Sequence, residues 1–298
     1  MVKYRKKILL AVDGSDQAFE TARYGSRLFP PNRMEVVLFH VMTKFPENFW
    51  DIEKEPAYRQ EVTTTSAWRL QQNKEIQKFM EKARRLFLKQ NVPEDAVRIK
   101  IQERKVGIAR DIMYESQNDY HGVVVGRWGM SMLKDFLWGS IANKLMGRLI
   151  NLPLCVVGGT PQLGKILVAI DASEGAMRAI DYVGDIVDHS HWEVTLFHAI
   201  RDLHTEELYR AEKSMESVLE TASNNLEKAG FNRNQIDVKM VTGTHSRAVA
   251  IITEALKGGY GTIVVGRRGL THVEEFIMGR VSNKIIHMGR EMAVWVVS

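Results

Sequence analysis

The sequence predicts two tandem α/β domains, each an open, doubly wound parallel sheet with flanking helices. The first observation is length, because 298 residues are enough for two ordinary domains with separate cores. The second is an internal repeat that covers nearly the whole chain. The third is that each copy alternates short apolar runs with longer helical patterns, which is typical of βαβ units.

The repeat is clearest where each copy begins. The segment KILLAVDGSDQAFETARYGSRL (7–28) aligns with KILVAIDASEGAMRAIDYVGDI (165–186) at an offset of 158 residues. Later in each copy the offset falls to 140, as for Gly126 and Gly266. Because 158 exceeds 140 by 18, the first copy carries an insertion of 18 residues, which we expect within 43–65. A Gly-Gly-Thr-Pro linker then divides the chain into domains of residues 1–158 and 159–298.

The elements follow in the same order in both copies. Residues 8–12 and 166–170 are continuous apolar runs, as expected of strands buried on both faces. Ser15 and Ser173 are natural N-caps for the helices that come next. The later elements expected in each copy are a second strand (35–42 and 193–200), an amphipathic helix facing the core (76–86 and 208–226), a fourth strand (123–125 and 263–265) and a fifth strand (154–157 and 293–297).

The composition is that of an ordinary globular protein, with 45% hydrophobic residues, 26% charged residues and a formal net charge of +5. No apolar run is long enough to span a bilayer. The basic cluster at residues 3–7 lacks the interleaved aromatic residues that stack on bases. We therefore expect a cytoplasmic protein that binds neither a membrane nor nucleic acid. The single cysteine, Cys155, lies in an apolar run and is expected to be a buried, unreactive thiol.

The predicted ligand site lies beyond the carboxyl ends of the strands, at the point where the strand order reverses. An aspartate after the first strand, the exit of the second strand and a glycine loop after the fourth strand meet there. In the first copy the loop reads Gly126-Arg127-Trp128-Gly129 and, nine residues later, Gly139-Ser140. Glycines let the backbone approach phosphates closely, and a helix N-terminus attracts anions. The pattern predicts a site for a phosphorylated small ligand.

The spacing G-x2-G-x9-G-[ST], with V-D-G-S far upstream, resembles the ATP-binding signature of the universal stress protein family, and the similarity runs twice along nearly the full chain. The resemblance implies a five-stranded parallel sheet in each domain. It implies adenine against the backbone of Val41, Asp13 near the ribose and base, and phosphates on Gly126, Gly129, Gly139 and Ser140. The implied ligand is ATP, with or without Mg²⁺.

The resemblance also has implications for assembly and partners. In single-domain relatives the last strands pair antiparallel across a dimer, so residues 154–157 and 293–297 are expected to pair within this chain, about a pseudo-twofold axis. The implied function is a stress-response regulator that binds an adenine nucleotide and a protein partner as yet unknown. A homodimer of the tandem chain stays open.

The second copy departs from the signature. It keeps Gly266, Gly269 and Gly279, and its equivalents of Asp13 and Val41 are Asp171 and Ala199. Arg280, however, stands where Ser or Thr is expected. An arginine there either clamps a phosphate or fills the phosphate site, and Ser282 is a candidate for the missing hydroxyl. We expect a nucleotide in the first copy and leave the second copy open.

Two further sets of residues have competing interpretations. Arg127, Arg267 and Arg268 lie inside the glycine loops, where either solvated side chains or phosphate contacts are expected. His40 and His198 recur at the ends of the second strands, and a structural role is favoured over a metal role because no partner stands at ligand spacing.

No residue stands out to position an attacking water, so we expect no enzyme beyond weak ATP hydrolysis. The alternatives are a slow Mg²⁺-dependent ATPase and a protein-interaction scaffold without nucleotide.

Overall fold

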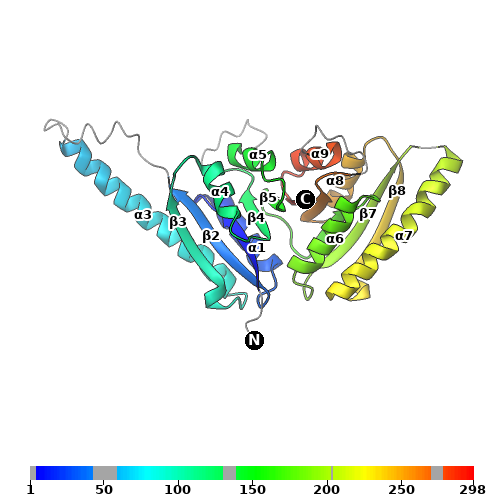
Figure 1. Ribbon diagram of the computed structural model, residues 1–298, viewed down its shortest axis with the longest axis horizontal. Coiled ribbons are helices and arrows are strands. Elements are labelled where there is room, and N and C mark those ends of the chain that lie inside the picture. Colours follow the sequence, from blue (N-terminus) through cyan, green and yellow to red (C-terminus); the bar gives the residue numbers. More distant parts are fainter. Residues whose placement is uncertain (1–4, 43–58, 130–138, 203, 270–277) are drawn as a thin grey trace.

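In the computed structural model the two copies share one ten-stranded sheet, with strand order β3-β2-β1-β4-β5-β10-β9-β6-β7-β8 (Figure 1). The structure describes residues 5–42, 59–129, 139–202, 204–269 and 278–298. Within these ranges, no helix is long and apolar enough to cross a membrane. Most of the predicted insertion, residues 43–58, lies outside them.

The first half contains five strands, four α-helices and one 3₁₀ turn in the described residues. Ser15 begins the first helix as predicted, because its hydroxyl accepts a hydrogen bond from the amide of Ala18. In chain order the elements are β1 (Lys6–Ala11), α1 (Asp16–Leu28), β2 (Met34–Met42), α3 (Arg59–Leu88), a 3₁₀ turn (Glu94–Ala96), β3 (Val97–Glu103), α4 (Ile108–Ser116), β4 (Gly122–Gly126), α5 (Ser140–Met146) and β5 (Leu154–Val157).

The second half repeats this order. Ser173 caps its first helix in the same way, accepting from the amide of Ala176. The elements are β6 (Lys165–Ala169), α6 (Glu174–Ile186), β7 (Glu193–Arg201), α7 (Thr205–Ala229), a 3₁₀ turn (Arg233–Gln235), β8 (Ile236–Thr244), α8 (Arg247–Gly258), β9 (Thr262–Gly266), α9 (Arg280–Met288) and β10 (Ala293–Val297).

Helices cover both faces of the sheet, which is why the inner strands are apolar on both sides. Successive residues of β1 alternate between two hydrophobic clusters: Ile8 and Leu10 belong to the cluster that includes residues of α1, α3, α6 and α7, whereas Leu9 belongs to the one that includes residues of α4, α5, α8 and α9. Met80 and Ala83 of α3 are fully buried, as their helical spacing predicts. Within each half all strand pairs are parallel, so the predicted fold class is confirmed.

The two halves join through their last strands. Strand β10 pairs antiparallel with β5, with Val294 opposite Val156 and Trp295 opposite Cys155. This pairing confirms the expected pseudo-twofold arrangement, with α3 and α7 at opposite ends of the molecule (Figure 1). Cys155 is fully buried at the junction, and burial raises the pKa of its thiol, as expected of an unreactive cysteine.

Candidate functional site

The strand order reverses between β1 and β4 in the first half and between β6 and β9 in the second. At such a point the loops that leave the two strands diverge to opposite faces, which opens a crevice beyond their carboxyl ends. The predicted aspartates and glycine loops follow these strands, so the topology brings them to one edge of the sheet in each half.

Asp13 lies directly against the glycine loop. Its Oδ1 accepts hydrogen bonds from the amide of Ser15 at 3.1 Å and from the Ser15 hydroxyl at 2.6 Å, and these bonds orient the carboxylate. Its Oδ2 comes so close to the Cα of Gly129 that a β-carbon at position 129 would collide with it. Asp171 and Gly269 stand in the same relation in the second half. The two strand ends therefore meet at a contact that only glycine permits.

The glycine loop is closed at its base. The amide of Gly139 donates to the carbonyl of Arg127 at 2.9 Å, and Gly279 donates to Arg267 at 2.8 Å in the second half. A β-carbon at Gly139 would collide with the carbonyl oxygen that it bonds. The structure thus brings Asp13, Gly129 and the two ends of the loop together, while residues 130–138 and 270–277 lie outside the described ranges.

The exit of β2 turns its backbone toward the same crevice. The carbonyl of Phe39 accepts from the amide of Val12 at 2.9 Å, so Phe39 faces β1. Backbone groups of alternate residues in a strand face the same side, so those of Val41 also face β1. Because the pairing of β1 with β2 ends at Ala11, Val41 faces the space past the end of β1, where Asp13 follows.

Arg127 does not face this crevice. Its side chain is fully buried and reaches into the other half, where Nη1 donates to the carbonyl of Ile286 at 2.7 Å and Nη2 to that of Gly289 at 2.9 Å. These carbonyls belong to the C-terminal end of α9, which lacks intrahelical partners for them. The guanidinium therefore has a role at the domain interface in place of the predicted phosphate contact.

Arg267 makes the reciprocal contact. Its Nη1 donates to Met146 at 3.1 Å and its Nη2 to Leu149 at 2.6 Å, at the C-terminal end of α5. Burial lowers the pKa of both arginines, Arg127 and Arg267, to about 10. The side chains of Arg127 and Arg267 are therefore neither solvated nor available to a phosphate, because each caps a helix of the other half.

The predicted phosphate positions of the two halves differ in side chain, although both are exposed. Ser140 and Arg280 are the exposed first residues of α5 and α9. The hydroxyl of Ser282, proposed above as a substitute, donates to the carbonyl of Gly266 at 2.7 Å and is buried. This hydroxyl therefore bonds the start of the glycine loop and does not replace the hydroxyl of Ser140.

The two recurring histidines are structural, as predicted. Nδ1 of His40 donates to the carbonyl of Val12 at 2.8 Å, and Nδ1 of His198 donates to that of Ile170 at 2.6 Å. Each bond ties the end of a second strand to the end of the first strand. Burial lowers the pKa of both imidazoles. Among the described residues, no group of three His, Cys, Asp or Glu side chains is placed to hold a metal ion.

The sequence model of the universal stress protein family matches this chain twice, over residues 5–157 and 163–296. The chain belongs to the universal stress protein family. It is similar to the universal stress protein YxiE of Bacillus subtilis, at 25% identity over 133 residues, which are 41% of this chain and 90% of YxiE.

Solved structures extend the similarity to both halves together. A universal stress protein from Archaeoglobus fulgidus DSM 4304 matches over 98% of each chain, with a TM-score of 0.62 and 19% identity. A functionally unknown protein of Pseudomonas aeruginosa PAO1 matches over 99% of this chain and 93% of its own, with a TM-score of 0.55 and 12% identity. At these identities the likeness concerns the fold alone, and it agrees with the tandem universal stress protein architecture.

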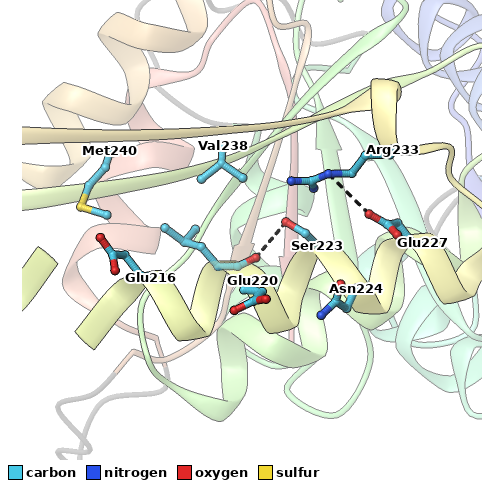
Figure 2. A pocket seen from close by; sticks show the side chains of 9 residues that line it. Glu216, Glu220, Ser223, Asn224, Glu227, Arg233, Val238 and Met240 are labelled. Atoms are coloured by element: carbon cyan, nitrogen blue, oxygen red, sulfur yellow. Dashed lines mark hydrogen bonds and ion pairs between the residues drawn. The ribbon is translucent and has the colours of Figure 1, made fainter. Parts of the chain in front are cut away.

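The structure also has a groove between α7 and β8 (Figure 2). Glu216, Glu220 and Glu227 line it, and Arg233 pairs with Glu227 at 3.6 Å. Three carboxylates on one wall repel a polyphosphate. This groove of the universal stress protein is therefore no alternative to the crevice at Asp13.

Two residues near the sites were missed from the sequence. Gln17 of α1 donates from Nε2 to the carbonyls of Val157 and Gly159, both at 3.1 Å, and so holds the start of the linker. Arg247, the first residue of α8, donates from Nε to the carbonyl of Ala199 at 3.2 Å. The signal for Arg247 in the sequence was that the equivalent residue of the first copy, Ile108, is aliphatic.

Proposed function

We propose that this universal stress protein binds an adenine nucleotide, ATP, in the crevice of its first half and acts as a nucleotide-responsive regulator. The observation that carries the proposal is the contact between Asp13 and Gly129. It supports a ligand site because it sets a carboxylate beside a glycine loop at the switch point of a parallel sheet, the place where such folds bind ligands.

The chemistry of the crevice fits the parts of an adenine nucleotide. A carboxylate oriented by two hydrogen bonds is a suitable acceptor for ribose hydroxyls. The backbone of Val41 offers a donor and an acceptor for the edge of the base. The glycine backbone of the loop and the hydroxyl of Ser140 suit phosphate oxygens. Mg²⁺ would be held chiefly by the phosphates, as it commonly is in nucleotide sites.

The test begins with purified protein that has not been exposed to added nucleotide. Mass spectrometry of the material released on denaturation should detect ATP or ADP, and calorimetry on the stripped protein should show ATP binding. A protein that releases no nucleotide and gives no heat with ATP favours the scaffold alternative. Accumulation of ADP with time, abolished by removing Mg²⁺, favours the slow ATPase.

Replacing Ser140 by Ala tests the phosphate position. Loss of a hydrogen bond to a charged group costs about 1.5–3 kcal/mol, so ATP affinity measured by calorimetry should fall roughly ten- to hundred-fold. The control is Ser214→Ala, which removes an exposed hydroxyl from α7 and should leave the affinity unchanged. If the two variants bind ATP equally well, Ser140 has no place in the site.

A further inference from the structure

The two halves differ at the first residue of the helix that follows their third strand. The ion pair Lys100–Glu115 of the first half, at 2.6 Å, recurs as Lys239–Glu254 at 2.9 Å in the second, which fixes the correspondence between α4 and α8. On this correspondence Arg247 replaces Ile108. The structure therefore places a guanidinium where the first half has an aliphatic side chain.

Arg247 lies at the second-strand exit of its own half. The carbonyl of Phe197 accepts from the amide of Ile170 at 2.9 Å, so Phe197 faces β6, and Ala199, two residues later, faces the same side. The pairing of β6 with β7 ends at Ala169 opposite Phe197. The carbonyl of Ala199 consequently faces past the end of β6, and it is this carbonyl that accepts from Nε of Arg247.

A second observation agrees with this position. The positive charge of Arg247 acts on His198, where it helps to lower the pKa of the imidazole, although burial contributes more. Asp171 acts on the same ring in the opposite direction. The guanidinium thus lies near the end of β7, where Ala199, His198 and Asp171 come together.

We propose that Arg247 closes the base subsite of the second half, so that only the first half accepts an adenine nucleotide. The inference rests on the proposed function, since the backbone of Val41 is there assigned to the base. An adenine presents its amine to such a carbonyl as a donor, and the guanidinium already bound to the carbonyl of Ala199 occupies the space beside it that the base would need. The difference between the halves then comes from Arg247, and Arg280 at the exposed start of α9 is not its cause.

Calorimetry with ATP on the full chain tests the inference through stoichiometry. The wild type should bind one ATP per chain, Arg247→Ile should bind two, and Ile108→Arg should bind none. Arg280→Ser is the matched control and should still bind one. A wild type that binds two, or a folded Arg247→Ile that gains no site, overturns the inference. So does a second site that opens in Arg280→Ser.

The design separates this inference from the proposed function. A wild type that binds no ATP contradicts the proposed function for the first half. In that case Arg247→Ile decides the inference by itself. Binding of one ATP by this variant supports the inference, and binding of no ATP overturns it. Arg247→Ala is a second variant in case isoleucine is poorly accommodated. An NMR titration of His198 checks that each variant is folded, because loss of the nearby charge should raise the pKa of that imidazole while its resonance stays dispersed.

Discussion

At the scale of single residues, the buried arginines of the glycine loops hold the two halves together. Each donates to two carbonyls at the end of a helix in the opposite half, so each helix end depends on the other domain. A guanidinium suits this task because its planar fork presents parallel N–H groups. An arginine inside a glycine loop is therefore not sufficient evidence of a phosphate contact.

Arg127→Lys tests this capping role. One ammonium replaces the fork poorly and leaves a buried carbonyl of α9 without a donor, so the free energy of unfolding in urea should fall by about 2 kcal/mol. Arg148→Lys, at an exposed position just after α5, should change it by less than about 0.5 kcal/mol. Equal stability of the two variants would contradict the capping role.

Tyr24 and Tyr182 at the junction are a second pair of equivalent residues. Unlike the two arginines, they have unequal partners. The hydroxyl of Tyr24 bonds to the hydroxyl of Thr262 at 3.1 Å and accepts from Nε1 of Trp295 at 3.0 Å. The hydroxyl of Tyr182 is buried against Gly122 and makes no hydrogen bond to the described residues. The difference follows from Gly122 in the first half standing where the second half has Thr262.

Phenylalanine at each tyrosine should therefore have opposite effects. Tyr24→Phe leaves two buried polar groups without a partner and should cost about 1–3 kcal/mol in the free energy of unfolding. Tyr182→Phe removes a buried hydroxyl that has no hydrogen-bond partner in the part of the chain that the structure describes, and should leave stability unchanged or raise it. Urea titrations of both variants measure the difference, and a loss at Tyr182 as large as that at Tyr24 would refute the argument.

At the scale of secondary structure elements, the shortest strand has the largest consequence. Strand β5 has four residues, all buried, and it continues the sheet from β4 to β10. An isolated half would expose this apolar edge, which favours pairing with other chains. Pairing with β10 satisfies both edges inside one molecule.

Val156→Asp should break this junction. It places an unpaired carboxylate in the buried cluster that β5 shares with α5 and α9, at a cost of roughly 3–5 kcal/mol, the range for a buried charge without a partner. We expect self-association in light scattering and faster proteolysis at the linker that follows β5. Val238→Asp provides the control, because Val238 is exposed on the edge strand β8. The idea fails if Val156→Asp scatters light and resists protease as the wild type does.

At the scale of the whole molecule, the fusion joins two copies that are alike in fold and unlike in their sites. The ten-stranded sheet ends in β3 and β8, and the crevices lie on either side of the central β5–β10 pair. Ile108 and Ser140, which begin α4 and α5 in the first half, correspond to Arg247 and Arg280, which begin α8 and α9 in the second. If Arg247 closes the second site as proposed, the chain responds to a nucleotide through its first half while the second half maintains the shared sheet.

The sequence alone determined the repeat, the strands buried on both faces and the serine caps, and it predicted where a ligand site would lie. These follow from local rules, because apolar runs, capping residues and the order of elements act over a few residues. The third strands received no prediction of their own. Their outer edges are solvated, so β8 combines buried and exposed residues without a continuous apolar run.

Only the tertiary structure decided which polar side chains serve the site and which serve the fold. Arg127 lies next to Gly126 in sequence, yet it bonds residues more than 150 positions away, at Ile286 and Gly289. Arg247 reaches Ala199 across 48 positions. A long side chain carries its charge several ångströms from its Cα, and the direction it takes depends on which buried carbonyls lack donors. That depends on how helices from both halves pack around the shared sheet, which no local pattern in the sequence contains.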